Sequence, residues 1–269
     1  MRLVTYDSGQ GERAGVVRDD GVVDAGTSVL ELLRAGALES LALGGPAQPL
    51  DGVRLLPPVP DPGKIICIGL NYRSHAEEQG AEPPETPTIF AKYPNALAAP
   101  GAEVALPSYS SKVDYEAEVA FVIGKRAKDV PEDSAHEHVA GYMLLNDLSA
   151  RDMQFATPQW MPGKVFDGAA PCGPWLVTPD EACPDDEITF ELTLNGDLMQ
   201  TGTTTDLVHG IPQLVAYLSK LMTLEPGDIV STGTPAGVGS LRDPRVWLKP
   251  GDEVVIESPT LGRLATKLA

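Results

Sequence analysis

Three carboxylates recur at alternate positions in the stretch 113–124, and their spacing is the first indication of chemistry in this chain. Asp114, Glu116 and Glu118 alternate with apolar residues, a pattern typical of one β-strand with one acidic face. Side chains on one face lie about 6–7 Å apart, so one carboxylate is expected to hold a proton unless a cation intervenes. Carboxylate oxygens suit Mg²⁺, Mn²⁺ or Ca²⁺. The alternative is an amphipathic edge strand whose acidic face lies in solvent.

A fourth carboxylate ends a second apolar run. Residues 141–146 are mostly apolar, and the run stops at Asp147. A buried charge without a partner costs several kcal/mol, so Asp147 needs a cation nearby. We therefore expect Asp147 to be the third metal ligand, beside Glu116 and Glu118.

A histidine and a glutamate stand three residues apart in the stretch 71–80. If this stretch is helical, His75 and Glu78 share one face. A carboxylate fixes the tautomer of an imidazole and raises its basicity, so the pair predicts a general base and its orienting partner. The alternative is a surface histidine beside a solvated acidic cluster.

Further polar residues follow Asp147 in the chain. A helical turn over 151–154 places Arg151 and Gln154 near it. Lys164 lies in a loop among apolar and small residues, where a lysine is either functional or simply solvent-exposed. Lys92, at the end of a predicted strand over 88–93, is either directed toward the site or an ordinary strand-end lysine.

The segment 228–239 runs from a buried strand into a glycine-rich turn. Its hydroxyls and backbone N–H groups form a nest suited to an anionic carboxylate or phosphate, and it includes Gly233 and Thr234. The spacings of nucleotide-binding glycine motifs are absent.

The overall charge excludes several function classes. A net charge of −18 over 269 residues argues against nucleic acid and anionic membranes as partners. The N-terminus lacks the apolar run of a signal peptide, and no run of about 18 apolar residues occurs, so a cytoplasmic protein is expected. The three cysteines are predicted to be reduced thiols.

The predicted elements divide the chain into two parts. Strands over 2–6 and 14–24 and a helix capped by Ser28 predict a small N-terminal α+β domain, which with a proline-rich linker covers residues 1–59. Strands over 64–70, 88–93, 174–178 and 187–194 and a helix over 211–222 predict a mixed, β-rich α/β catalytic domain over residues 60–269.

Taken together, these residues resemble the fumarylacetoacetate hydrolase family over about residues 60–269. Each motif is weak alone, but five in the same order are specific. The ordered set is Asn71-Tyr72 with His75 and Glu78, Asp114-Tyr115-Glu116-Ala117-Glu118, Asn146-Asp147 with Arg151-Asp152 and Gln154, Gly163-Lys164, and Thr232-Gly233-Thr234-Pro235-Ala236-Gly237-Val238-Gly239.

The resemblance implies a mixed β-roll with flanking short helices, assembled as a homodimer. It implies Mg²⁺, with Mn²⁺ or Ca²⁺ tolerated, bound by Glu116, Glu118 and Asp147. It also implies a small-molecule 2-oxo acid as substrate. The residues expected to hold the substrate are Gln154, Thr234, Arg151 and Gly233, and those expected to act in catalysis are His75, Glu78 and Lys164.

The reaction implied first is hydrolysis of a C–C bond in an acylpyruvate-type acid, which releases pyruvate and a carboxylic acid. His75 would activate water, and Lys164 would stabilise the enolate. Isomerases or decarboxylases of unsaturated 2-oxo diacids and an oxaloacetate decarboxylase share this framework and stay open as alternatives, as does a non-catalytic keto-acid-binding protein.

Two features bear on the pocket. Val165 and the run 168–170 depart from the family pattern, which predicts an altered pocket shape. The substrate's distal side chain is expected to meet a lid over 79–87 and the N-terminal unit.

Overall fold

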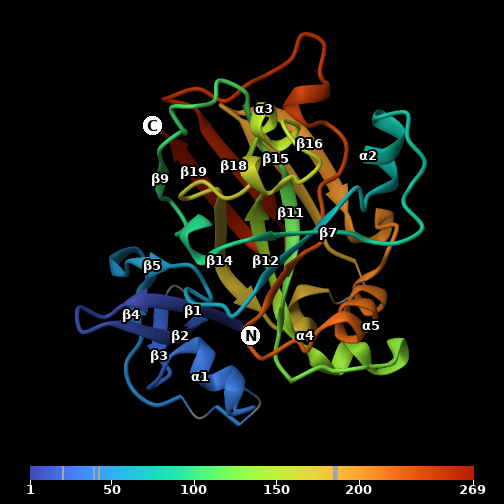
Figure 1. Cartoon of the computed structure of the whole chain (residues 1–269). Helices are drawn as coiled ribbons and strands as arrows, with labels where there is room; N and C mark the ends of the chain where they lie inside the picture. The colour runs from blue at the N-terminus through green and yellow to red at the C-terminus, as the bar shows by residue number, and fades with distance from the viewer. Residues whose placement is uncertain (20, 39, 42, 184–186) are drawn as a thin grey trace.

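The computed structural model describes residues 1–19, 21–38, 40–41, 43–183 and 187–269. It is rich in strands, with short helices around them (Figure 1), which confirms the predicted β-rich mixed α/β class. No helix in the described part is long and apolar enough to cross a membrane.

Most strands join one twisted sheet. Its order is β4 (Gln48–Pro49), β3 (Gly21–Asp24), β2 (Glu12–Arg18), β1 (Arg2–Asp7), β14 (Ala170–Val177), β12 (Val139–Asn146), β11 (Ala117–Ile123), β17 (Ile229–Ser231), β6 (Ile65–Gly69) and β7 (Thr88–Lys92), with β5 (Leu55–Leu56) paired to β1 and β8 (Leu97–Ala98) paired to β14.

Two smaller sheets and short helices complete the described part. The second sheet runs β16 (Asp197–Thr203), β15 (Thr189–Leu194), β18 (Glu253–Ser258), β19 (Gly262–Leu268) and β9 (Glu103–Val104), and β10 (Val113–Asp114) pairs with β13 (Ser149–Ala150). The helices are α1 (Val29–Arg34), α2 (Arg73–Glu78), α3 (Arg151–Gln154), α4 (Pro179–Ala182) and α5 (Ile211–Leu221), and 3₁₀ turns cover Leu50–Gly52, Pro94–Ala96, Glu132–His138, Met161–Gly163, Thr204–Asp206 and Gly239–Leu241.

The stretch 113–124 is not the single strand predicted from its alternation. β10 ends at Asp114 and belongs to a different sheet from β11, which begins at Ala117. β11 lies between β12 and β17, and all its residues are buried, so the edge-strand alternative is also wrong. A carboxylate on such a central strand has no access to bulk solvent and needs partners inside the protein.

The register between β11 and β12 brings distant carboxylates together. Ala117 pairs with Asn146, and the Asp147 N–H donates to the Glu116 carbonyl at 2.9 Å. The residue before β11 therefore lies beside the residue after β12. This pairing explains how positions 116 and 147, far apart in sequence, enter one site.

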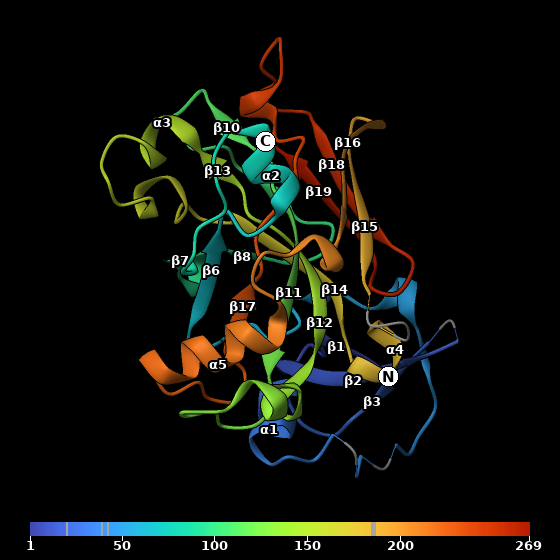
Figure 2. The same ribbon diagram turned by 90° about the vertical axis from the view of Figure 1, so that its right-hand side faces the viewer.

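The N-terminal segment extends the large sheet, since β1 pairs with β14 (Figure 2). Ser28 caps α1 with a reciprocal capping box to Glu31, as predicted. The predicted strand stretch 14–24 covers most of β2 and all of β3, and its residue 20 lies outside the described residues. The division of the chain at residues 59 and 60 stays a prediction.

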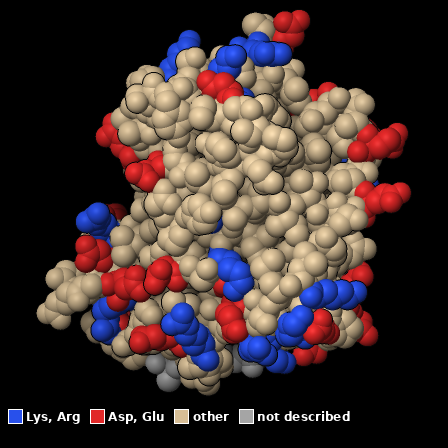
Figure 3. All heavy atoms as spheres, viewed as in Figure 1, with Lys and Arg blue, Asp and Glu red and all other residues tan. Residues whose placement is uncertain are grey.

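The surface follows the acidic composition. On the face in Figure 3, acidic side chains gather largely along the edges, and much of the middle carries neither sign of charge.

Candidate active site

Three carboxylates converge in the interior, as predicted. Glu116, Glu118 and Asp147 are all buried, and one ligand oxygen from each lies within 4.8 Å of the others. They come from the residue before β11, from β11 itself and from the residue after β12. Such an oxygen-only donor set could hold a hard divalent cation. Asp114 lies outside this cluster.

Lysine and arginine side chains accompany the carboxylates. Lys164 Nζ donates to Glu116 Oε2 at 2.6 Å and to Asp147 Oδ2 at 2.7 Å. Lys92 Nζ lies 2.8 Å from Asp147 Oδ1, so its side chain is directed toward the site. Lys164 is 2% exposed, and the solvent-exposed alternative is therefore wrong.

Arg151 links Asp114 to the cluster. Its Nε donates to Asp114 Oδ2 at 2.9 Å, and its Nη2 lies 2.8 Å from Glu116 Oε1. Arg151 Nη1 also donates to Gln154 Oε1 at 2.9 Å, as the predicted helical turn allows. The guanidinium is thus fixed by several acidic and amide oxygens.

The carboxylates differ in their proton affinity. Burial raises the pKa of Glu118 well above its usual range, and Asp147 and Glu116 raise it further. Burial alone would also raise the pKa of Glu116, but Arg151 and Lys164 outweigh it and lower that pKa to about 2. Glu118 accepts hydrogen bonds from Ser231 Oγ and Gly233 N but has no ion pair in the described part.

The residues present fit a divalent metal. Asp147 Oδ1 is buried and, among the described residues, receives no hydrogen bond in good geometry despite the nearby Lys92. Glu118 needs either a proton or a cation to remain buried. A metal held by Glu116, Glu118 and Asp147 would meet both needs.

His75 and Glu78 form the pair predicted from their spacing. His75 is buried on α2, so the surface-histidine alternative is wrong. Its Nδ1 lies 3.0 Å from Glu78 Oε2, and the Gln79 amide lies 2.9 Å from its Nε2. Since the amide nitrogen donates, Nδ1 carries the proton and Nε2 the lone pair. Nε2 is therefore the basic atom.

The glycine-rich segment after β17 binds the protein's own carboxylates. The N–H of Gly233 donates to Glu118, and the N–H of Gly237 donates to Glu78 Oε1 at 2.9 Å. The N–H of Gly239 donates to Asp114 Oδ1 at 2.8 Å. A φ of +97° at residue 233 favours glycine there. The nest predicted for an external anion thus holds internal ones.

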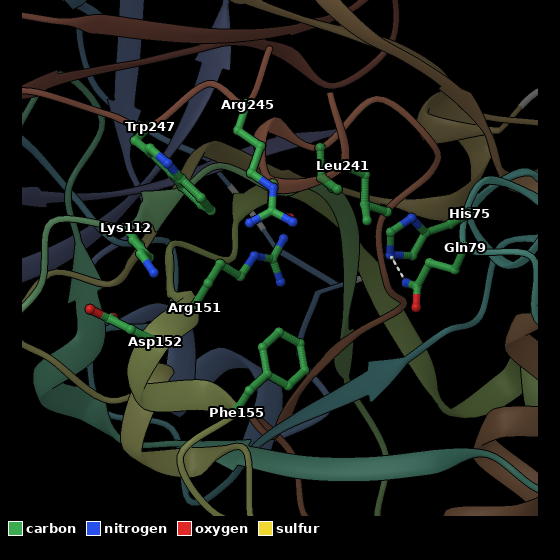
Figure 4. A pocket seen from close by; sticks show the side chains of 11 residues that line it. His75, Gln79, Lys112, Arg151, Asp152, Phe155, Leu241, Arg245 and Trp247 are labelled. Carbon is green, nitrogen blue, oxygen red and sulfur yellow. Dashed lines mark hydrogen bonds between the residues drawn. The ribbon is translucent and has the colours of Figure 1, made fainter. Parts of the chain in front are cut away.

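Two adjoining cavities open beside these groups. The inner one, of about 60 Å³, is lined by Glu116, Glu118 and Lys164 together with the predicted residues Gln154 and Thr234. The outer one has a volume of about 360 Å³ (Figure 4). Both are lined by His75, Gln79, Arg151 and Phe155. The two cavities therefore share part of their walls.

The walls of these cavities differ from the prediction. In the part of the chain that the structure describes, Gln79 is the one residue of 79–87 that lines them, and the N-terminal unit contributes none. Val165 and residues 168–170 line neither cavity. Lining residues not predicted from sequence include Phe90, Lys112, Phe155, Trp160, Arg245 and Trp247, which lie in strands, helix ends and loops without a shared motif.

Comparison with known proteins gives consistent matches. The family described as fumarylacetoacetate (FAA) hydrolase C-terminal matches residues 64–269. Oxaloacetate tautomerase FAHD2A, mitochondrial, from Homo sapiens is 41% identical over 86% of this chain and 74% of its own.

Solved structures of enzymes also match along the whole chain. The 5-carboxymethyl-2-hydroxymuconate delta-isomerase from Mycobacterium smegmatis has a TM-score of 0.85 at 34% identity, and covers 100% of this chain and 99% of its own. The maleylpyruvate hydrolase from Sphingobium sp. SYK-6 has a TM-score of 0.82 at 33% identity, with coverage of 100% and 99%.

Proposed function

The chain belongs to the fumarylacetoacetate hydrolase family, a family of enzymes, and on that premise we propose that it is a Mg²⁺-dependent keto–enol tautomerase or isomerase of a 2-oxo acid. The observation that carries this proposal is the position of His75 Nε2, an oriented base on the wall of the cavity that Glu116 and Glu118 also line. Proton transfer next to a ketone needs a base, fixed positive charge and little else.

The bound metal would polarise the ketone oxygen of the substrate and stabilise negative charge on it. His75 Nε2 takes a proton from the carbon next to the ketone, the C–H electron pair forms a C=C bond, and the carbonyl pair moves to oxygen. Returning the proton to that oxygen gives the enol, and returning it to a conjugated carbon gives an isomer. Glu78 Oε2, 3.0 Å from Nδ1, stabilises the imidazolium in between.

Lys164 supplies fixed positive charge rather than a base. Burial alone would lower the pKa of its ammonium, but Asp147 and Glu116 outweigh burial and raise it. The ammonium on the wall of the inner cavity therefore stays charged and stabilises the developing enolate. Gln154 and Thr234 line the same cavity, and we expect them to contact the 2-oxo acid end.

Hydrolysis of an acylpyruvate is the second candidate. The similarity to maleylpyruvate hydrolase favours it, and the same His75–Glu78 pair can activate water. In that reaction water attacks the distal carbonyl, the C–C bond breaks, and the electron pair leaves as the pyruvate enolate.

Product analysis separates the two candidates. Enol-oxaloacetate, acetylpyruvate and fumarylpyruvate are each incubated with the full chain in Mg²⁺ and in EDTA. Accelerated loss of the enol absorbance without pyruvate release supports tautomerisation, while pyruvate release from the acylpyruvates supports hydrolysis. Equal rates in EDTA and Mg²⁺ would contradict the metal dependence. Assembly as a homodimer and a cytoplasmic location stay predictions.

A further inference from the structure

The outer cavity carries positive charge that the proposed proton transfer does not use. Lys112 and Arg245 line it, both are exposed, and neither side chain has an ion pair or hydrogen bond among the described residues. The third cation there, Arg151, is already paired with Asp114 and Glu116. In a chain with a net charge of −18, two unpaired cations in one cavity form a distinct local field.

The geometry of the cavity places these cations around a common space. In Figure 4 the guanidinium of Arg245 points toward that of Arg151. Lys112 lies to the left of these two groups, near Asp152. The carboxylates of Asp114 and Glu116 offset the charge of Arg151, whereas Arg245 has no carboxylate partner among the described residues, and an anion in the cavity would supply one. The one acidic lining residue, Asp152, accepts hydrogen bonds from Ser110 Oγ at 2.6 Å and the Met153 N–H at 3.1 Å.

Apolar side chains form part of the remaining wall, beside the polar residues His75, Gln79 and Ser240. Phe155, Leu241 and Trp247 line the cavity, and Phe155 and Leu241 are 65% and 44% exposed. Phe155 also lines the inner cavity, so an apolar surface extends from the carboxylate cluster toward Arg245. Such a surface suits a hydrocarbon chain with an anionic group at its far end.

We propose that the outer cavity binds the distal carboxylate of a 2-oxo dicarboxylic acid, with Lys112 and Arg245 as its partners and Phe155 and Trp247 against its carbon chain. The inference rests on the proposed function, because the 2-oxo acid end must occupy the inner cavity. Such a site would select diacids that are too large for the inner cavity, whose volume is about 60 Å³, to enclose. Arg245 and Lys112 are thus specificity residues that act on the end of the substrate remote from the reacting carbon.

Calorimetric titration of the Mg²⁺-loaded full chain tests this assignment. The probes are 2-oxoheptanedioate, the matched monoacid 2-oxoheptanoate, and pyruvate. The diacid is expected to bind roughly ten- to a hundred-fold more tightly than the monoacid, as charge-assisted hydrogen bonds allow. Arg245→Ala and Lys112→Ala are each expected to reduce this ratio several-fold. Lys249→Ala, which removes an exposed lysine outside the cavity, is the matched control and should retain it.

The outcomes separate the two proposals. If pyruvate and the monoacid bind but the diacid binds no more tightly, or if both cavity variants retain the full ratio, the distal site is wrong and the proposed function stands. If none of the three 2-oxo acids binds, both proposals fall. Circular dichroism of each variant shows whether it is folded, and because neither side chain has a partner, both are expected to fold normally.

Discussion

Lys164 Nζ and Glu116 Oε2 lie 2.6 Å apart at the centre of the proposed metal site. The ammonium therefore shares the carboxylate oxygens that a metal ion would bind. Without metal it pairs with Glu116 and Asp147, and with metal it would compete for the same oxygens. This dual position makes stability and metal binding interdependent.

Lys164→Met should make the metal-free protein less stable and more dependent on Mg²⁺. Breaking a buried ion pair from one side costs about 3–5 kcal/mol, because Glu116 and Asp147 lose a buried partner. Mg²⁺ can supply the missing charge. Urea unfolding in EDTA and in saturating Mg²⁺ measures both effects, with the exposed Lys249→Met as control. Equal stabilisation of parent and variant by Mg²⁺ would contradict the shared-oxygen interpretation.

Glu118→Gln should weaken Mg²⁺ binding at least about ten-fold while retaining the fold. Because burial raises the pKa of Glu118, a metal must displace its proton, and the affinity of the parent should rise with pH. In the glutamine variant, the Mg²⁺ affinity should no longer depend on pH through the carboxyl group at position 118. Calorimetry at several pH values is the measurement, and the exposed Glu191→Gln serves as control. An unchanged affinity would exclude Glu118 as a ligand.

His75→Asn should slow turnover by at least about a hundred-fold, since it removes the base. Glu78→Gln should slow it less, by about ten-fold, because the imidazolium loses its negative partner. Steady-state rates with the substrates above measure both. His136→Asn, at an exposed position, is the control. Parent-like turnover of the His75 variant would remove the proposed base.

Asp24→Asn should destabilise the protein at neutral pH but not in strong acid. Hydrogen bonds from Arg13, at 2.7 and 2.8 Å, hold the pKa of Asp24 well below its ordinary value of about 3.9. A depressed folded-state pKa contributes stability that is present above about pH 4 and is lost as the pH falls toward the folded value. Urea midpoints at pH 7 and pH 2.5 should show the difference shrinking, with exposed Asp61→Asn as control. A difference independent of pH would rule out this linkage.

Much of the fold followed from local patterns. The buried strand over 65–69, the helix over 211–221 and the Ser28 cap are where apolar periodicity and capping chemistry predict them. The carboxylate cluster was also predictable, because Asp147 ends a buried strand and a buried charge needs a partner.

The rest depends on pairing that local patterns do not encode. The alternation over 113–124 looks like one continuous strand. Asp114 nevertheless belongs to β10, which pairs with β13 in a separate sheet, and its carboxylate binds Arg151. The backbone N–H groups after β17 donate to internal carboxylates. To predict these hydrogen bonds, one would have to know where α2 and β10 lie. Arg245 and Lys112 line one cavity only because tertiary packing brings together loops more than a hundred positions apart in the chain.

The short segment 233–237 holds one carboxylate at each end: Gly233 binds Glu118, and Gly237 binds Glu78. The orienting partner of the proposed base and one proposed ligand are therefore tethered to the same few peptide units. When this segment shifts, both groups shift with it, so their mutual alignment survives thermal motion of the loops around them. A mutation that makes segment 233–237 more mobile would therefore disturb the alignment of Glu78 and Glu118 without changing either acidic side chain.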